Sequence, residues 1–137
     1  MWIVYALLAA FFASLVAILA KIGIQEINSN LAVAIRTVVV LLMAWLIVFA
    51  GGKHGEISAL TQKNWIFLIL SGIATGLSWI FYYRALQIGD VSKVVPIDKL
   101  SIVFTMILAF SFLGEPLSAK IIVAGLLIVA GTFVLIL

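Results

Sequence analysis

Apolar residues form five long runs along the chain, and short polar segments separate them. The runs cover about residues 2–22, 31–50, 65–88, 91–113 and 118–137. Each is near the ~20 residues that an α-helix needs to cross a ~30 Å hydrocarbon core. Backbone polar groups inside lipid must be satisfied within the protein, so runs of this length predict helices. The pattern therefore predicts an all-α fold, a polytopic membrane protein with a five-transmembrane-helix bundle in a single domain, residues 1–137.

The segments between the runs carry helix-capping and turn signals. Residues 28–30 (Asn-Ser-Asn) offer an N-cap for the second helix, and Ser118 offers one for the fifth. The long polar connection, residues 51–64, starts with helix-ending glycines and predicts a short surface turn near residues 57–60. Residues 114–116 (Gly-Glu-Pro) break the fourth helix, so the short connection that follows predicts an antiparallel hairpin of helices four and five.

The first apolar run has a second interpretation, a secretory signal peptide. No Lys or Arg precedes the run, and Lys21 follows it without an Ala-x-Ala type of cleavage site. The run is therefore interpreted as the first membrane span.

Composition excludes several classes of protein. Of the 137 residues 66% are hydrophobic and 9% charged, whereas a soluble domain carries about 25% charged residues. There is no Cys, and the single His54 lies in a loop without the spacing of a catalytic triad or a metal site. We therefore expect neither an enzyme nor a protein with a metal or cofactor. The net charge of +3 is too small and too dispersed to indicate nucleic acid as a partner.

Two charged residues interrupt the start of the fourth apolar run. Asp98 and Lys99 follow Pro96 closely, and a charged side chain at the bilayer centre costs roughly 2.5–3.5 kcal/mol on insertion scales. Such residues usually line a cavity or a pathway, which makes this segment a candidate site. A third embedded charge, Arg36, lies about as deep in the second run, roughly 9–10 Å from the same side of the membrane at 1.5 Å per residue. That side, where runs one and three end and runs two and four begin, is called the far side below.

The pairing of these charges follows from helix geometry. Asp98 and Lys99 are adjacent and so ~100° apart on a continuous helix. We therefore predict that Asp98 pairs with Arg36, or with Lys21 from the end of the first run, in preference to Lys99. One alternative is that Arg36 and Asp98 form only an ion pair that fixes the helix register. For Lys21 the alternative is anchoring to lipid headgroups.

Aromatic and glycine residues of the third run add to this picture. Trp79, Tyr82 and Tyr83 lie toward its far-side end, where they form either an interface belt or a surface that stacks on or hydrogen-bonds a ligand. Gly72 and Gly76 form a small-xxx-small pattern that favours close contact with another helix. On the far side, cations form a predicted basic vestibule of Lys21, Arg36, Arg84, Lys93 and Lys99.

Membrane orientation is not decided by the positive charges. The cations near the ends of the spans divide evenly between the two sides: Lys53, Lys63 and Lys120 on one side, and Lys21, Arg84 and Lys93 on the other. A chain that inserts in both orientations can form an antiparallel homodimer. Inverted repeats around a site at the membrane midplane are a common route to alternating access.

The C-terminal part, residues 82–134, resembles the EamA domain of the drug/metabolite transporter superfamily. The motifs that carry the resemblance are Tyr83-Arg84-Ala85-Leu86, Pro96, Leu113-Gly114-Glu115, and Gly125 with Gly131. Lys21 after the first span and Arg36 early in the second also match, so the resemblance covers essentially the whole chain. Most members carry two such domains in ten spans. The resemblance therefore implies an EamA-like half transporter that dimerises.

The last three spans also resemble spans two to four of the small multidrug resistance family, which needs a membrane-embedded Glu in its first helix. The first span here has no carboxylate, and Ala13 stands at about that depth. This difference argues against export of polyaromatic cations. Asp98 is the one embedded acid available if transport is coupled to protons.

Taken together, these features predict a membrane transporter protomer in a bacterial-type inner membrane. Its expected partners are membrane lipid, a small polar or anionic metabolite as substrate, and a second copy of the chain. The candidate site consists of Asp98, Lys99, Arg36, Lys21, Tyr82, Tyr83 and Trp79. The alternative is an accessory or structural subunit of a heterodimeric transporter or flippase.

Overall fold

A computed structural model describes residues 1–116 and 118–137, and within them every regular element is helical. The α-helices are α1 (Trp2–Gly23), α2 (Ser29–Ala50), α3 (Gln62–Ile88), α4 (Val91–Asp98), α5 (Ser101–Leu108) and α6 (Ala119–Ile136). A 3-10 helix, η1 (Lys53–Ala59), and a π-helical turn, η2 (Ala109–Leu113), complete the chain. Five segments are long and apolar enough to cross a membrane, the fourth being Val91–Leu113. The predicted all-α membrane fold is confirmed.

The predicted caps form, and the long connection is more ordered than expected. The Asn28 side chain accepts a hydrogen bond of 2.8 Å from the backbone N–H of Asn30, at the start of α2. The Ser118 hydroxyl accepts one of 3.3 Å from Ile121 at the start of α6. Between α2 and α3, a left-handed Gly52 (φ +66°) turns the chain into η1, where only a short turn was predicted. Glycine is favoured there because residues with a Cβ are strained at positive φ.

The chain consists of two compact units whose boundaries lie within α1 and at the end of α3. The α2–α3 unit comprises residues 18–87, and the α4–α6 unit comprises residues 1–17 and 88–137. Each unit is described by itself.

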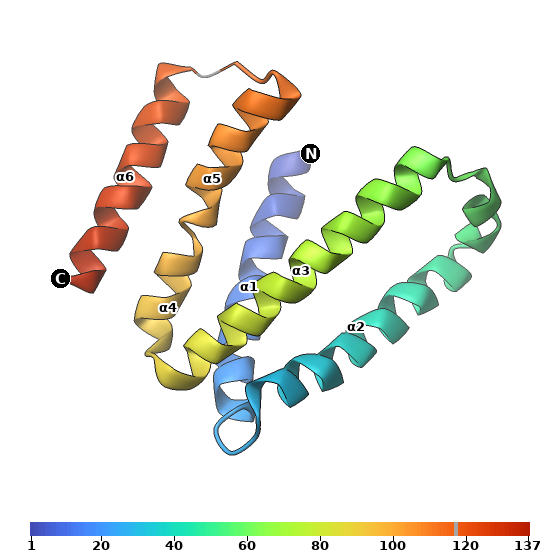
Figure 1. Ribbon diagram of the computed structural model, residues 1–137, viewed down its shortest axis with the longest axis horizontal. Coiled ribbons are helices and arrows are strands. Elements are labelled where there is room, and N and C mark those ends of the chain that lie inside the picture. The colour runs from blue at the N-terminus through green and yellow to red at the C-terminus, as the bar shows by residue number, and fades with distance from the viewer. Residues whose placement is uncertain (117) are drawn as a thin grey trace. The chain divides into compact units, whose positions relative to one another are not determined.

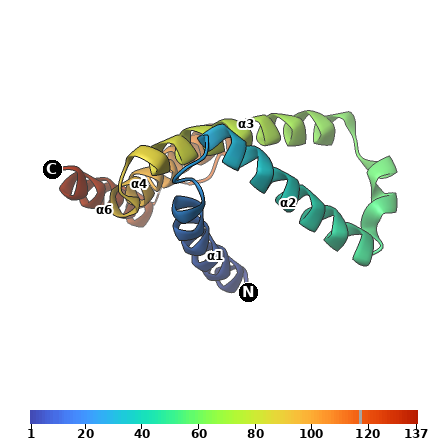
Figure 2. The same cartoon turned by 90° about the horizontal axis from the view of Figure 1, so that it is seen from below.

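In the α2–α3 unit, η1 joins the end of α2 to the start of α3 (Figure 2). The buried apolar side chains of this unit gather at the end away from η1, around the turn between α1 and α2: Ile24, Val33, Tyr83 and Leu86. Most of the other large apolar side chains of α2 and α3 are exposed. In a membrane-spanning segment, such side chains face acyl chains, so the packing of this unit is concentrated at the far side.

In the α4–α6 unit, α6 runs beside α4 and α5 (Figure 1). Gly125 of α6 is buried, and a Cβ at this position would lie 3.6 Å from the sulfur of Met106 in α5. Thr132, which lies further along α6, is also buried and donates a hydrogen bond of 2.8 Å to the carbonyl of Ile128. The small residues of α6 therefore allow α6 to approach α5 closely.

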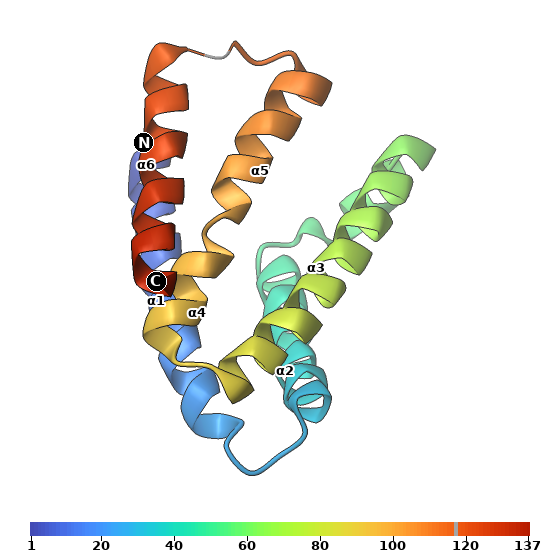
Figure 3. The ribbon, with the colours of Figure 1, turned by 60° about the vertical axis from the view of Figure 1, so that its left-hand side comes forward.

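The fourth span is not one continuous helix, contrary to the sequence-based prediction. It is interrupted at Lys99 and Leu100, between α4 and α5 (Figure 3). At the interruption the backbone uses tight i to i+3 hydrogen bonds, from Leu100 to Ile97 (3.0 Å) and from Ile102 to Lys99 (3.0 Å). Pro96 has already removed one donor from the ladder, because proline has no N–H. Short 3-10 stretches within a helix frequently mark functional hinges.

The small-xxx-small pattern of α3 makes no close helix contact within its own unit. A Cβ at Gly72 or Gly76 would meet no atom within 4 Å. Among residues 18–87 these glycines therefore contact no other helix, because α2 and α3 approach each other at the far-side end, and a close contact with a helix of another chain stays a prediction. This face of α3 is open.

Candidate substrate and coupling site

Arg36 lies against aromatic rings instead of against an acid of its own unit. Its guanidinium carbon is 4.4 Å from the centroid of the Trp79 ring and 5.6 Å from that of Tyr83. Trp79 and Tyr83 are four residues apart, so they share one face of α3. Tyr83 is only 3% exposed, and Arg36 and Trp79 are half-buried. A cation held against aromatic faces is attracted by the negative face of each ring.

The Arg36 guanidinium is not paired with an acid of its own unit. Within residues 18–87 no carboxylate lies within 4.0 Å of it. Stacking uses the flat face of the guanidinium, whereas its N–H donors lie in the plane and match the two oxygens of a carboxylate or phosphate. The group can therefore be held by rings and bind an anion at the same time.

Lys21 and Gln87 tie the far-side ends of three helices together. The Lys21 ammonium donates a hydrogen bond of 2.6 Å to the carbonyl of Leu86, in the last turn of α3. The Gln87 amide donates to Ile24 (3.3 Å) and Ile27 (2.8 Å), whose carbonyls belong to the end of α1 and the turn after it. These contacts confirm that the end of α1, the start of α2 and the end of α3 lie on one side. Lys21 stabilises a helix terminus here, since cations favour C-terminal carbonyls.

Gln87 was missed by the sequence analysis, although a signal existed. An amide in the last turn of an otherwise apolar helix, beside a short turn with unpaired carbonyls, is suited to bridge them. Gln87 also accepts a hydrogen bond of 2.9 Å from Arg84. Arg84, which was assigned to the predicted basic vestibule, is exposed and is bonded to Gln87 at the end of α3. Tyr82 is half-buried, and its ring meets that of Tyr83 edge to face at 6.2 Å.

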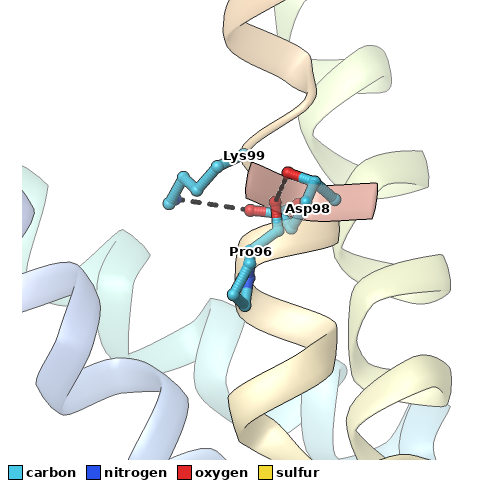
Figure 4. Close-up of polar contacts among 4 residues, drawn as sticks. Pro96, Asp98 and Lys99 are labelled. Carbon is cyan, nitrogen blue, oxygen red and sulfur yellow. Dashed lines mark hydrogen bonds and ion pairs between the residues drawn. The ribbon is translucent and has the colours of Figure 1, made fainter. Parts of the chain in front are cut away.

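Asp98 pairs with its own neighbour, Lys99, which corrects the prediction that it would avoid that residue. The Lys99 ammonium is 3.4 Å from a carboxylate oxygen of Asp98, and Figure 4 shows the lysine side chain reaching back toward it. The prediction assumed a continuous helix with adjacent side chains ~100° apart. The backbone of Lys99 keeps right-handed helical angles (φ −68°, ψ −8°), so the contact arises because the long, flexible lysine side chain folds back across this separation. The pair is partly exposed, 49% for Lys99 and 35% for Asp98.

A backbone carbonyl and a hydroxyl lie next to this pair. The Pro96 carbonyl is 3.5 Å from the hydroxyl oxygen of Thr132, a long hydrogen bond between α4 and α6. Thr132 was not singled out from the sequence, where it appears as one hydroxyl in an apolar, glycine-containing helix. The helix break therefore brings together an acid, a base and polar backbone groups in one membrane span.

The predicted site residues thus belong to two clusters. One is the aromatic–arginine cluster, Arg36 with Trp79, Tyr82 and Tyr83, close to the Lys21 contact in the α2–α3 unit. The other is the Asp98–Lys99 pair of the α4–α6 unit. Pairing of Arg36 or Lys21 with Asp98 stays a prediction. Among the described residues, no group of three or more His, Asp or Glu side chains is placed to hold a metal ion.

Five long apolar helices with a few embedded charges define a multi-pass membrane protein. Residues 1–137 match the EamA-like transporter family. The chain is also 46% identical over 134 residues to a protein of Sinorhizobium sp described as "Uncharacterized transporter in cobO 3'region", a match that covers 98% of this chain and 95% of that protein. No solved structure matches the chain. The chain belongs to the EamA-like transporter family, and it is a membrane transporter.

Proposed function

We propose that the chain is a transporter protomer that moves a small polar or anionic metabolite across a bacterial-type inner membrane by alternating access, as an antiparallel homodimer. The observation that carries the substrate class is Arg36, whose guanidinium is held 4.4 Å from the Trp79 ring with no carboxylate of its own unit within 4.0 Å. An embedded cation whose position is fixed by rings, and not by an acid of its own unit, is suited to a substrate that supplies the negative charge.

Each residue of the aromatic–arginine cluster has a distinct role in this proposal. Arg36 binds the anionic or polar group of the substrate, and Trp79 and Tyr83 hold its guanidinium in place. Tyr82 lies beside them and contributes a hydroxyl or a ring face at the rim. Lys21 is a positioning residue in this proposal, because its hydrogen bond to the Leu86 carbonyl fixes the end of α3, the helix that carries the rings.

The helix break supplies the second half of the proposal. Interrupted membrane helices place backbone carbonyls and helix ends at transporter sites, and alternating access moves one part of the protein against another around them. Here the interruption at Lys99 and Leu100 adjoins the Asp98–Lys99 pair. We infer that Asp98 is the coupling acid and that Lys99 is its counter-ion. A weak, partly exposed pair can separate at low cost during transport.

We infer dimerisation from the distribution of charge between the two ends of the spans. One EamA-like domain spans residues 1–137, and the cations at the span ends divide evenly between the two sides of the membrane, which permits both orientations. Two copies in opposite orientations form the inverted repeat that alternating access uses. The open glycine face of α3 is available for such a contact.

Proteoliposome counterflow tests the substrate class and the site. Lactate, succinate, glycerol 3-phosphate, alanine and glucose are offered as labelled probes to the parent, Arg36→Lys and Asp98→Asn. We expect flux of at least one anionic probe, reduced about tenfold in Arg36→Lys because lysine keeps the charge but loses the planar fork. Lys63→Gln is the matched control, since it removes a cation outside both clusters.

Different outcomes remove different parts of the proposal. Arg36 is excluded as the anion-binding group if glucose alone is transported, or if the parent and Arg36→Lys transport the anionic probes equally. Unchanged flux and unchanged pH dependence in Asp98→Asn exclude Asp98 from coupling. Neither result bears on the fold or on membership of the family.

A second candidate function is an accessory or structural subunit of a heterodimeric transporter or flippase. The observation that favours it is the open face of α3, where Gly72 and Gly76 contact nothing within 4 Å and a different chain could pack. Topology mapping with tags at both ends separates the two. Both orientations in one population support the antiparallel homodimer, whereas a single orientation with a co-purifying partner supports the subunit.

A further inference from the structure

A cavity of about 330 Å³ lies where α2 ends and η1 begins, within the α2–α3 unit and at the opposite end of α2 from Arg36. Most of its lining is apolar, and two charged side chains complete it: Ala44, Trp45, Val48, Ile57 and Leu60, with Lys53 and Glu56. The volume is at the lower end of the range of sites that bind small organic groups.

The walls of the cavity are held by specific contacts. Trp45, Phe49 and His54 form a series of ring contacts, with centroids 5.6 Å and 5.5 Å apart, so that η1 is fixed against the last turns of α2. On η1 itself, the Lys53 ammonium and the Glu56 carboxylate form an ion pair of 2.8 Å. The left-handed Gly52 provides the turn between α2 and η1. The cavity is therefore a built feature of this connection.

The order of its lining matches the order of groups in a lipid. Ala44 and Trp45 precede the end of α2 by five or six residues, about 8–9 Å at 1.5 Å per residue, and so lie at the depth of the upper acyl chains. Tryptophan favours this interfacial depth. Lys53 and Glu56 follow the helix end, where headgroups lie, and both side chains are largely exposed, 69% and 68%. The apolar groups that α2 contributes are thus deep, and the charges of η1 are at the surface, where Ile57 and Leu60 add apolar contact beside them.

The charges select among headgroups. A cation and an anion side by side complement a ligand that carries both charges a short distance apart. In an ethanolamine phospholipid the phosphate can accept from Lys53, while the primary ammonium donates to Glu56. A lipid with only a phosphate meets Glu56 as a like charge, and a choline headgroup has no N–H to donate.

We propose that this cavity is a binding site for a zwitterionic aminophospholipid, with the headgroup on the Lys53–Glu56 pair and the first part of an acyl chain against Trp45, Ile57 and Leu60. The site is separate from the proposed transport site and does not depend on which substrate is moved. It would bind a lipid of the surrounding bilayer at an interhelical connection that forms a folded surface element.

Native mass spectrometry of the full chain in detergent tests the site with three added lipids of equal chains: dioleoyl phosphatidylethanolamine, phosphatidylcholine and phosphatidylglycerol. We expect phosphatidylethanolamine to be retained about threefold more than either other lipid, the size expected for exposed charge pairs. Glu56→Gln should remove this preference, and Lys53→Gln should lower retention of phosphatidylethanolamine and phosphatidylglycerol alike. Lys63→Gln, which removes a nearby cation that does not line the cavity, should match the parent.

A second measurement guards against loss of fold in the variants. Trp45 is made the only tryptophan (Trp2→Phe, Trp65→Phe and Trp79→Phe), and its fluorescence is quenched by phosphatidylethanolamine with brominated acyl chains. We expect quenching that Glu56→Gln weakens about threefold while helicity by circular dichroism is unchanged. Equal retention of the three lipids, strongest retention of phosphatidylglycerol, or quenching indifferent to Glu56→Gln overturns the proposal.

Discussion

The two units of this chain handle embedded charge in opposite ways. In the α2–α3 unit, Arg36 lies on aromatic rings and has no acid partner within that unit. In the α4–α6 unit, Asp98 and Lys99 neutralise each other at a helix break. Under the proposed function, the first arrangement provides a charge for a ligand and the second provides a charge pair that can open, so that binding and coupling are separate tasks of the two units.

The units also differ in where their helices pack. In the α4–α6 unit, Gly125 permits close contact between α5 and α6. In the α2–α3 unit, the buried side chains gather at the far-side end, and the glycines of α3 face open space. Substitutions in the two units should therefore have different effects on the stability of the protomer.

The largest expected effect comes from filling the contact at Gly125. Gly125→Leu should lower the free energy of unfolding by about 1–3 kcal/mol, because the extra side chain must displace Met106. Gly125→Ala should be tolerated, since a Cβ 3.6 Å from the Met106 sulfur is an ordinary contact. Gly72→Leu is the matched control in α3. Unfolding in mixed detergent micelles measures all three, and equal losses at Gly125 and Gly72 would contradict the difference between the units.

A smaller effect should appear in the coupling between Arg36 and Trp79. A double-mutant cycle with Arg36→Leu and Trp79→Leu should give an interaction free energy of about 1–2 kcal/mol, as expected for a partly desolvated cation–π contact. The same cycle with Trp65→Leu in place of Trp79→Leu should give a value near zero, because Trp65 lies near the other end of α3. Equal values in the two cycles would show that the ring contact does not hold Arg36.

Loss of the Lys21 contact should have a modest effect. Lys21→Met removes the cation at the C-terminal carbonyls of α3 and should cost about 0.3–1 kcal/mol. Lys120→Met is the control, because Lys120 lies in the first turn of α6, where the helix dipole does not stabilise a cation. Thermal unfolding in detergent compares the two. A loss in Lys120→Met as large as that in Lys21→Met would argue against a helix-end role for Lys21.

The smallest effect on stability should come from the Asp98–Lys99 pair. The charged atoms of the pair are 3.4 Å apart, and both side chains are more than a third exposed. A double-mutant cycle of Asp98→Asn and Lys99→Gln should therefore give a coupling free energy below about 1 kcal/mol. The parent, single and double variants are measured by the same unfolding assay. A coupling larger than that of Arg36 and Trp79 would reverse the comparison and make this pair a structural element.

The sequence was sufficient for the features that depend on local pattern. Run length predicted the five spans, because crossing the hydrocarbon core sets a minimum number of apolar residues. The caps at Asn28 and Ser118 were predictable because capping depends on a side chain and the backbone two or three residues away. Embedded charges identified Asp98, Lys99 and Arg36 as candidates, because charged residues are rare within apolar spans and can be recognised there from the sequence alone.

Only the tertiary structure decided what those charges contact. The sequence does not show that Arg36 lies on Trp79 and Tyr83, that Lys99 folds back to Asp98, or that Gln87 bridges to Ile24 and Ile27. Apolar runs look alike on every face, so their pattern does not indicate which face of a helix meets another. The helix break at Lys99 and Leu100 adds a second limit, because distances along a helix predict directions only while the helix is continuous.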